Sequence, residues 1–209
     1  MGGWEEVNQK LEAFARRIVQ AAPTETRAAR EAAIKSAVED MADNIRELGG
    51  PSGSQEVNTL RNQVDEFLAG PLWDSINSEL QHDSIASALR RLTQPEGFIV
   101  VRRIGGPEFV QLALDSRGVF LDVPVQTLNA QQMSRTARFF RTLDVTIDTV
   151  DLRDEPGGDR SGAVPRFRKH FGEEFDLACN AALSAIKTIT ALDVIDLEVN
   201  VDWSFSVIA

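Results

Sequence analysis

Cys179 is the only cysteine of the chain and the first candidate for a nucleophile. A cysteine nucleophile needs a base within hydrogen-bonding reach, and the chain has two histidines, His82 and His170. His170 precedes a predicted long helix, residues 173–191, that carries Cys179, so the two could meet and form an enzyme such as a hydrolase. The alanines on both sides of Cys179 favour the other interpretation, a small residue in a hydrophobic core. We therefore predict no catalytic residue.

Two acidic series raise the possibility of metal binding or acid–base chemistry. The first alternates along a predicted strand and consists of Asp196, Glu198, Asn200 and Asp202. Neighbours on one strand face lie about 6.5–7 Å apart, too far for most adjacent side chains to chelate one ion unaided. The second consists of Asp144, Asp148, Asp151 and Asp154. We expect both series to face solvent. Two histidines and one cysteine cannot form a zinc cage, and the glycine turns lack phosphate-loop spacing, so we predict no metal and no cofactor.

Three cations, Arg166, Arg168 and Lys169, form a small basic island in an acidic stretch of the chain. The island follows a loop predicted over residues 154–165, which is rich in glycine and charge. It could grip an acidic segment of a partner protein, or it could simply balance the two glutamates that follow it. Both alternatives stay open, and these three residues are our candidates for partner binding.

The composition limits the classes of partner. The chain has 209 residues, 32 acidic and 22 basic, with a formal net charge of -10. Such a charge repels phosphate backbones, so we expect no nucleic-acid partner. No apolar run is long enough to span a membrane, and the first residues lack the pattern of a secretory signal. One cysteine allows no intrachain disulfide. We expect an acidic cytoplasmic protein of bacterial type.

Helical spacing of apolar residues continues through the first part of the chain, residues 3–93. Two amphipathic segments flank Pro23, with Thr24 as a possible N-cap, and predict a helical hairpin over residues 1–48. The hairpin should bury Trp4, Phe14, Ile34, Met41 and Ile45.

Further helical segments are predicted beyond this hairpin. Residues 49–54, Gly-Gly-Pro-Ser-Gly-Ser, should end the second helix and act as a linker. A third helix over 57–68 and two shorter helical pieces, 72–80 and 85–92, should follow.

The second part of the chain has the alternation of strands. Residues Gly97–Pro124 read as an antiparallel meander, with turns at Gly105-Gly106-Pro107 and Asp115–Gly118. A helix over 130–143, a strand over 145–152, the helix 173–191 and a strand over 194–207 follow it. We therefore predict an α+β fold, in which an N-terminal helical region precedes an antiparallel sheet packed against helices. The predicted domains are 1–82 and 83–209.

In the order of its elements, the region from about 83 to 208 resembles the fold shared by the class I type III secretion chaperones and the YbjN-like family. The resemblance rests on the helix IASALRRL, the strands GFIVV, EFVQLAL and VFLDV, and the segments MSRTARFFRTLDV and PRFRKHFGEEFDLACNAALSAIKTI. It implies a protein that binds other polypeptides on an exposed sheet or helix face, often as a dimer. It implies no cofactor and no reaction.

We therefore expect a non-enzymatic chaperone-like or adaptor protein that binds a protein partner in a bacterial multiprotein system, concerned with secretion or defence. It could act as a homodimer or in a hetero-complex. The alternative is a structural or regulatory subunit that its N-terminal helices hold in a stable hetero-oligomeric assembly. An enzyme built on Cys179 and His170 is the third hypothesis.

Overall fold

The computed structural model describes the backbone of residues 3–21, 26–92, 97–145, 148–151, 163–193 and 195–202. Side chains are described for residues 9–21, 26–43, 55–92, 97–145, 165–193 and 195–201. The chain divides into two compact units, Met1–Leu80 and Gln81–Ala209, and the division falls within helix α3 (Pro71–Arg91). The predicted boundary, between residues 82 and 83, lies close to this division.

The first unit consists of α1 (Gly3–Ala21), α2 (Arg27–Leu68) and the beginning of α3. One core joins these helices, and its buried residues are Leu11, Ala15, Val19, Ile34, Val38, Val64, Phe67, Leu68, Trp73 and Ile76. Because α1 and the start of α2 are separate helices that share this core, the two helices predicted on either side of Pro23 are confirmed.

The burial predicted for this hairpin is only partly correct. Ile34 is buried and Phe14 packs against the core, but Met41 is 47% exposed, so its predicted burial is wrong. The buried stripe of α2 runs through Ile34, Val38 and Ala42 at four-residue spacing, which leaves Met41 on the flank. The side chains of Trp4 and Ile45 lie outside the described residues.

The N-cap of α2 is Thr26. Its hydroxyl oxygen accepts a hydrogen bond from the backbone N–H of Ala29 at 3.2 Å, which satisfies one of the free N–H groups at the start of the helix. Thr24, the predicted cap, lies outside the described residues.

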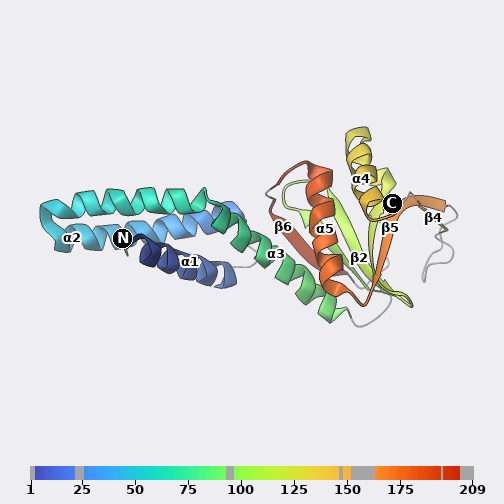
Figure 1. Cartoon of the computed structure of the whole chain (residues 1–209), viewed down its shortest axis with the longest axis horizontal. Helices are drawn as coiled ribbons and strands as arrows, with labels where there is room; N and C mark the ends of the chain where they lie inside the picture. Colours follow the sequence, from blue (N-terminus) through green and yellow to red (C-terminus); the bar gives the residue numbers. More distant parts are fainter. Residues whose placement is uncertain are drawn as a thin grey trace. The chain divides into compact units, whose positions relative to one another are not determined.

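The predicted linker over residues 49–54 is helical in the structure, so the prediction that the second helix ends there is wrong. The two halves of α2 nevertheless run side by side (Figure 1). Arg27 Nη2 donates to the carbonyl oxygen of Leu68 at 3.3 Å, and Lys35 Nζ lies 2.8 Å from Asp65 Oδ1. A straight helix of this length would separate its ends by roughly 60 Å. The chain therefore reverses within α2, in the part that contains the Gly/Pro-rich stretch.

The two short helical pieces predicted after Pro71 are a single helix, α3. No glycine or proline interrupts the sequence from Leu72 to Arg91, so nothing in the backbone breaks the helix between the two predicted pieces.

The second unit is built on a six-stranded sheet with the order β4-β5-β3-β2-β1-β6, in which every pair is antiparallel. Its strands are β1 (Phe98–Arg103), β2 (Phe109–Asp115), β3 (Gly118–Pro124), β4 (Asp148–Asp151), β5 (Ala163–Gly172) and β6 (Leu197–Asp202). The predicted meander is confirmed as β1, β2 and β3. The predicted strands over 145–152 and 194–207 join the same sheet as β4 and β6, at its two edges.

Strand β5 was not predicted, because its charged residues were interpreted as a basic island after a loop. The last residues of the predicted loop 154–165 begin this strand at Ala163, and residues 154–162 lie outside the described residues. Within β5, Phe167 faces the core and the flanking Arg166 and Arg168 face the other way, which is the alternation of a strand.

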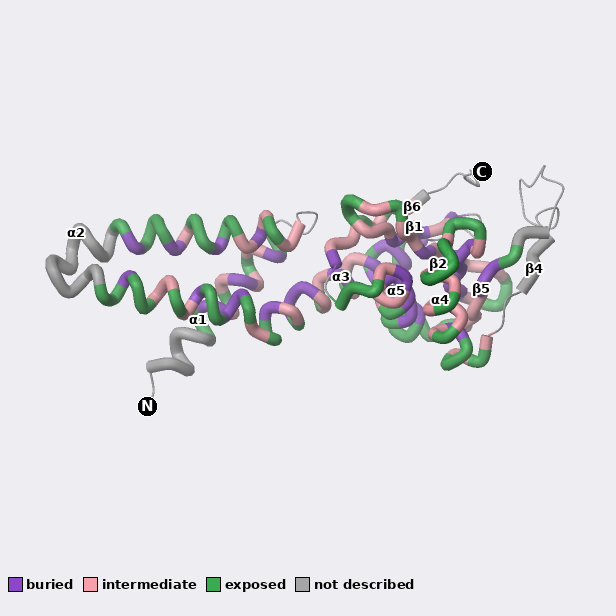
Figure 2. Tube along the Cα trace, turned by 90° about the horizontal axis from the view of Figure 1, so that it is seen from above, coloured by how far each residue is buried: buried purple, intermediate pink, exposed green. Residues whose placement is uncertain are grey.

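Helices α4 (Ala130–Thr142), α5 (Phe175–Thr190) and the end of α3 pack on one face of the sheet (Figures 1 and 2). Asn129 caps α4 in a capping box with Gln132, and the short 3-10 helix η1 (Val125–Thr127) connects β3 to it. The main buried residues between helices and sheet are Leu89, Ile99, Val101, Val110, Leu112, Leu121, Phe140, Phe167, Cys179, Ile186 and Ile189. The predicted α+β fold is therefore confirmed.

Candidate functional site

The candidate functional surface is the face of the sheet opposite α4 and α5, which we call the open face. Side chains alternate along a strand, so the residues on this face are those between the core residues. They are Phe98, Val100, Arg102, Phe109, Gln111, Ala113, Asp115, Phe120, Asp122, Arg166, Arg168, His170, Glu198 and Asn200. Among the described elements, the helices that pack on the sheet contribute to the core on its other face.

An ion cluster of Asp122, Arg166 and Arg168 lies on the open face, between β3 and β5. Arg166 Nη1 is 2.6 Å from Asp122 Oδ2, and Arg168 Nε is 3.2 Å from Asp122 Oδ1. Asp122 is only 1% exposed. The pKa of Asp122 is raised above the ordinary aspartate value, because burial outweighs the opposing effect of the two arginines. The two guanidinium groups in direct contact favour the ionised carboxylate against this effect of burial.

Two aromatic contacts extend this cluster along β5. The guanidinium of Arg168 lies over the ring of Phe120, 4.3 Å from its centroid, which is a cation–π geometry. The His170 ring packs against the same phenyl group at 5.2 Å between centroids. Asp122 and Phe120 were not singled out in the sequence. The signal for Asp122 was a lone acid inside the apolar strand VFLDV, since a buried carboxylate requires a basic partner.

The structure separates the three residues of the basic island. Arg166 and Arg168 face the open side and bind Asp122, whereas Lys169 faces the helices and donates from Nζ to the carbonyl oxygen of Leu143 at 2.8 Å. Arg166 is only 6% exposed, so little of its side chain is accessible to a partner. The two arginines pair with Asp122. Whether any of the three contacts a partner stays a prediction.

The structure does not bring Cys179 and His170 together. Cys179 is fully buried in the core on α5, and burial raises the pKa of its thiol to about 11. His170 lies on the open face, with the sheet between it and Cys179. A cysteine nucleophile acts as the thiolate and needs a base beside it. The raised pKa keeps the Cys179 thiol protonated, and His170 is too far away to act as its base.

The acidic series of β6 lies on the open face. Glu198 and Asn200 are exposed there, and the side chain of Asp202 lies outside the described residues. In the second series, Asp148 and Asp151 belong to β4, and Asp154 lies outside the described residues. Within the described parts of the chain, no group of three or more histidine, cysteine, aspartate and glutamate side chains is placed to hold a metal ion.

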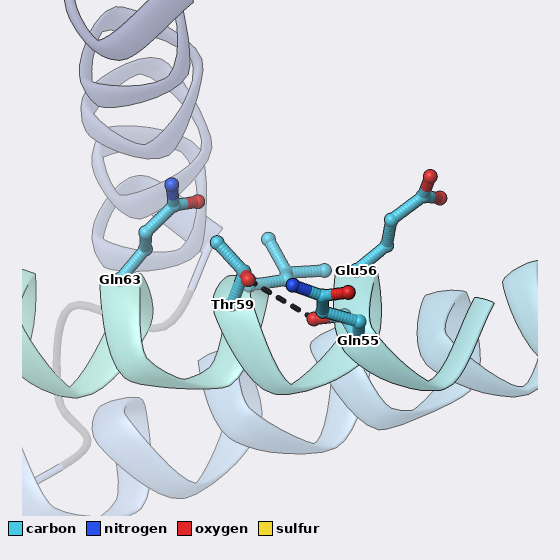
Figure 3. A pocket seen from close by; sticks show the side chains of 5 residues that line it. Gln55, Glu56, Thr59 and Gln63 are labelled. Atoms are coloured by element: carbon cyan, nitrogen blue, oxygen red, sulfur yellow. Dashed lines mark hydrogen bonds between the residues drawn. The ribbon is translucent and has the colours of Figure 1, made fainter. Parts of the chain in front are cut away.

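A shallow depression lies on the second half of α2, in the helical unit (Figure 3). Its lining residues are Gln55, Glu56, Thr59, Leu60 and Gln63. They all come from one helix, and the hydroxyl of Thr59 is already used in a 3.0 Å hydrogen bond to the carbonyl oxygen of Gln55. Glu56 is the single ionisable group in this lining, so the depression lacks the convergent polar groups of an active site.

No helix in the described part of the chain is both long and apolar enough to cross a lipid bilayer. Comparison with protein-family models, with curated proteins and with solved structures finds no match. Function must therefore be inferred from the geometry of the open face.

Proposed function

We propose that this chain is a non-enzymatic chaperone-like or adaptor protein that binds a protein partner through the open face, in a bacterial multiprotein system for secretion or defence. The composition of this face carries the proposal. In an antiparallel sheet with one face toward water, alternate positions are usually polar. Here the half-buried Val100 and Phe109 occupy such positions, with charged residues around them. Phe120 is buried beside them, under the guanidinium of Arg168. An apolar centre within a polar rim is typical of protein-binding surfaces.

The placement of the ionisable groups supports a non-enzymatic role. The Asp122 carboxylate is engaged by two arginines, and Cys179 lies in the core on the other side of the sheet from His170. Charges that neutralise one another stabilise a surface without offering a free acid or base.

The expected partner is a polypeptide segment with apolar side chains and acidic neighbours. Arg102 of β1 and Arg168 of β5 lie on the open face on either side of its apolar centre. Of the three residues of the basic island, Arg168 is the one best placed for such a partner. Arg166 is almost completely buried against Asp122, and Lys169 lies on the other face.

Site-specific photo-crosslinking in the native host tests the proposal. A photoreactive residue is placed on the open face at Val100 or at Gln111, and on the exposed surface of α5 at Leu177 as a matched control. The proposal expects the same partner protein to be captured from both open-face positions and not from Leu177. Capture of a second copy of the chain from both positions would show that the partner is another copy of the chain and that the protein forms a homodimer through this face. Equal capture from all three positions, or none from the open face, would refute the proposal.

The alternative, a structural subunit held by its N-terminal helices, has one observation in its favour. Met41 of α2 is a large apolar residue with almost half of its surface exposed on the helical unit. The same experiment with the photoreactive residue at Met41 separates the two proposals. A stable partner captured from Met41, with none from Val100 or Gln111, would favour the subunit.

A further inference from the structure

Asp115 organises the turn between β2 and β3. Its Oδ1 accepts a hydrogen bond from the backbone N–H of Arg117 at 2.8 Å, and its Oδ2 lies 3.3 Å from Arg117 Nη2. The Arg117 side chain is otherwise largely exposed. One carboxylate therefore fixes both the backbone of the turn and the direction of its arginine.

His170 of β5 reaches this carboxylate from the far side of β3. Its Nδ1 lies 3.7 Å from Asp115 Oδ1, which is beyond a hydrogen bond, and this buried nitrogen has no hydrogen-bond partner among the described residues. Gly118 of β3 is paired with Asp115 of β2. Because glycine has no side chain, β3 places none between Asp115 and β5 at this position. A Cβ atom at Gly118 would overlap the carbonyl group of Gly172, so the close approach of β5 requires glycine there. The ring of Phe120 packs against the imidazole in a tilted contact.

Groups of both charges surround the imidazole. Arg117 of the turn and Arg168 of β5 are positive, and Asp115 of β2 and Asp122 of β3 are negative. Burial lowers the pKa of His170, the two arginines lower it further, and the two carboxylates oppose this. The pKa of His170 is therefore lower than the ordinary histidine value, so the ring takes up a proton at a more acidic pH than a free histidine does.

We propose that His170 is a pH-sensitive switch for the β2–β3 turn, in which the protonated imidazole takes Asp115 as its partner and releases the side chain of Arg117. A proton from solvent gives the ring a positive charge and makes both of its nitrogens donors. A charge-assisted hydrogen bond is about 2.7–2.9 Å long, so a movement of about 1 Å brings Nδ1 to Asp115 Oδ1. The imidazolium then takes Oδ1, and its positive charge repels the nearby guanidinium of Arg117, which is held on Oδ2 only by an exposed pair. The exposed arginine side chain therefore leaves. The β2–β3 turn gains a free cation at acidic pH.

NMR spectra of the full chain between pH 8 and pH 5 test the switch, with the Arg117 amide, the Arg117 side-chain N–H and the His170 ring as probes. All three should change with one shared midpoint, below about pH 6.5. His170→Gln should abolish the change at Arg117. Asp115→Asn should also abolish it, while His170 still titrates at a lower midpoint because an opposing negative charge is gone.

The control is the other histidine of the chain. His82→Gln should leave the titration of Arg117 unchanged, since His82 lies on α3 and not on the open face. The proposal is overturned if Arg117 does not respond over this pH range, or if its response persists in His170→Gln. Unchanged amide shifts in the core strands show that the variants fold.

Discussion

The carboxylate of Asp122 lies 2.6 Å from the guanidinium of Arg166, and both side chains are buried although they belong to the face of the sheet without helices. Arg168 completes the cluster from the same strand. The cluster connects β3 to β5, which returns to the sheet only after α4 and β4. Loss of Asp122 would leave the two arginines without the carboxylate that pairs with them.

The first prediction concerns that loss. Asp122→Ala leaves two guanidinium groups beside one another without a counter-charge, so the free energy of unfolding should fall by about 3–5 kcal/mol. Urea denaturation measures it. Asp65→Ala, which removes an exposed ion pair with Lys35 on α2, is the control and should have a much smaller effect. Equal effects of the two variants would mean that the buried cluster contributes no more than a surface pair.

The second prediction concerns the arginines of the basic island. Arg166→Glu combined with Arg168→Glu places two further carboxylates beside Asp122 in a buried setting, so the double variant should fail to fold. Circular dichroism and solubility measure this. Arg138→Glu with Arg141→Glu reverses two exposed charges on α4 and should leave folding intact. A folded Arg166/Arg168 variant would instead support the exposed, partner-binding island expected from the sequence.

The meander and the two helices of the second unit could be predicted because their signals are local. Glycine turns separate the first three strands, and the apolar spacing of α5 places Ala178, Cys179 and Ala182 on one side. Strand β5 could not be recognised in the same way, because three of its residues on one face are Arg166, Arg168 and His170. The two arginines are tolerated there because β3 supplies Asp122 opposite them, a contact between positions far apart in the sequence.

The course of the chain in the helical unit also depends on contacts between residues that are far apart in the sequence. Gly49, Gly50 and Pro51 are usual helix terminators, and the chain does reverse in this part of α2, yet helical backbone continues through them. Whether a helix ends or bends at such residues depends on tertiary contacts, such as those of Arg27 with Leu68 and Lys35 with Asp65. The candidate surface itself was expected only in general terms, as an exposed sheet face. Which residues lie on it follows from the pairing of strands.

The third prediction concerns the two glycines with positive φ in the turns of the meander. Gly105 has φ of 76° and open space where a Cβ would be, so Gly105→Ala should cost only the strain of a left-handed backbone, about 1–2 kcal/mol. Gly118 has φ of 100° and would in addition meet the backbone of Gly172. Gly118→Ala should therefore lower the melting temperature more than Gly105→Ala does. Equal shifts would show that β5 can move away from β3 at little cost.

The fourth prediction concerns the reactivity of Cys179. With its pKa raised to about 11, the buried thiol has almost no thiolate at pH 8. Iodoacetamide should therefore leave the native protein unlabelled and label it rapidly after unfolding in urea, as followed by mass spectrometry. Rapid labelling of the native protein would contradict the core placement and would strengthen the enzyme hypothesis.

The fifth prediction concerns stability and pH. Because the pKa of His170 is lowered in the folded protein, the unfolded chain binds the proton more tightly. The contribution of neutral His170 to stability is therefore complete above the ordinary histidine pKa of about 6.5 and decreases as the pH falls below it. Urea denaturation at several values between pH 7.5 and pH 5 should show this decrease in the parent protein and a smaller one in His170→Gln. His82→Gln should follow the parent. An identical pH dependence in the parent and in His170→Gln would place the acid sensitivity in another group and remove the energetic basis of the switch.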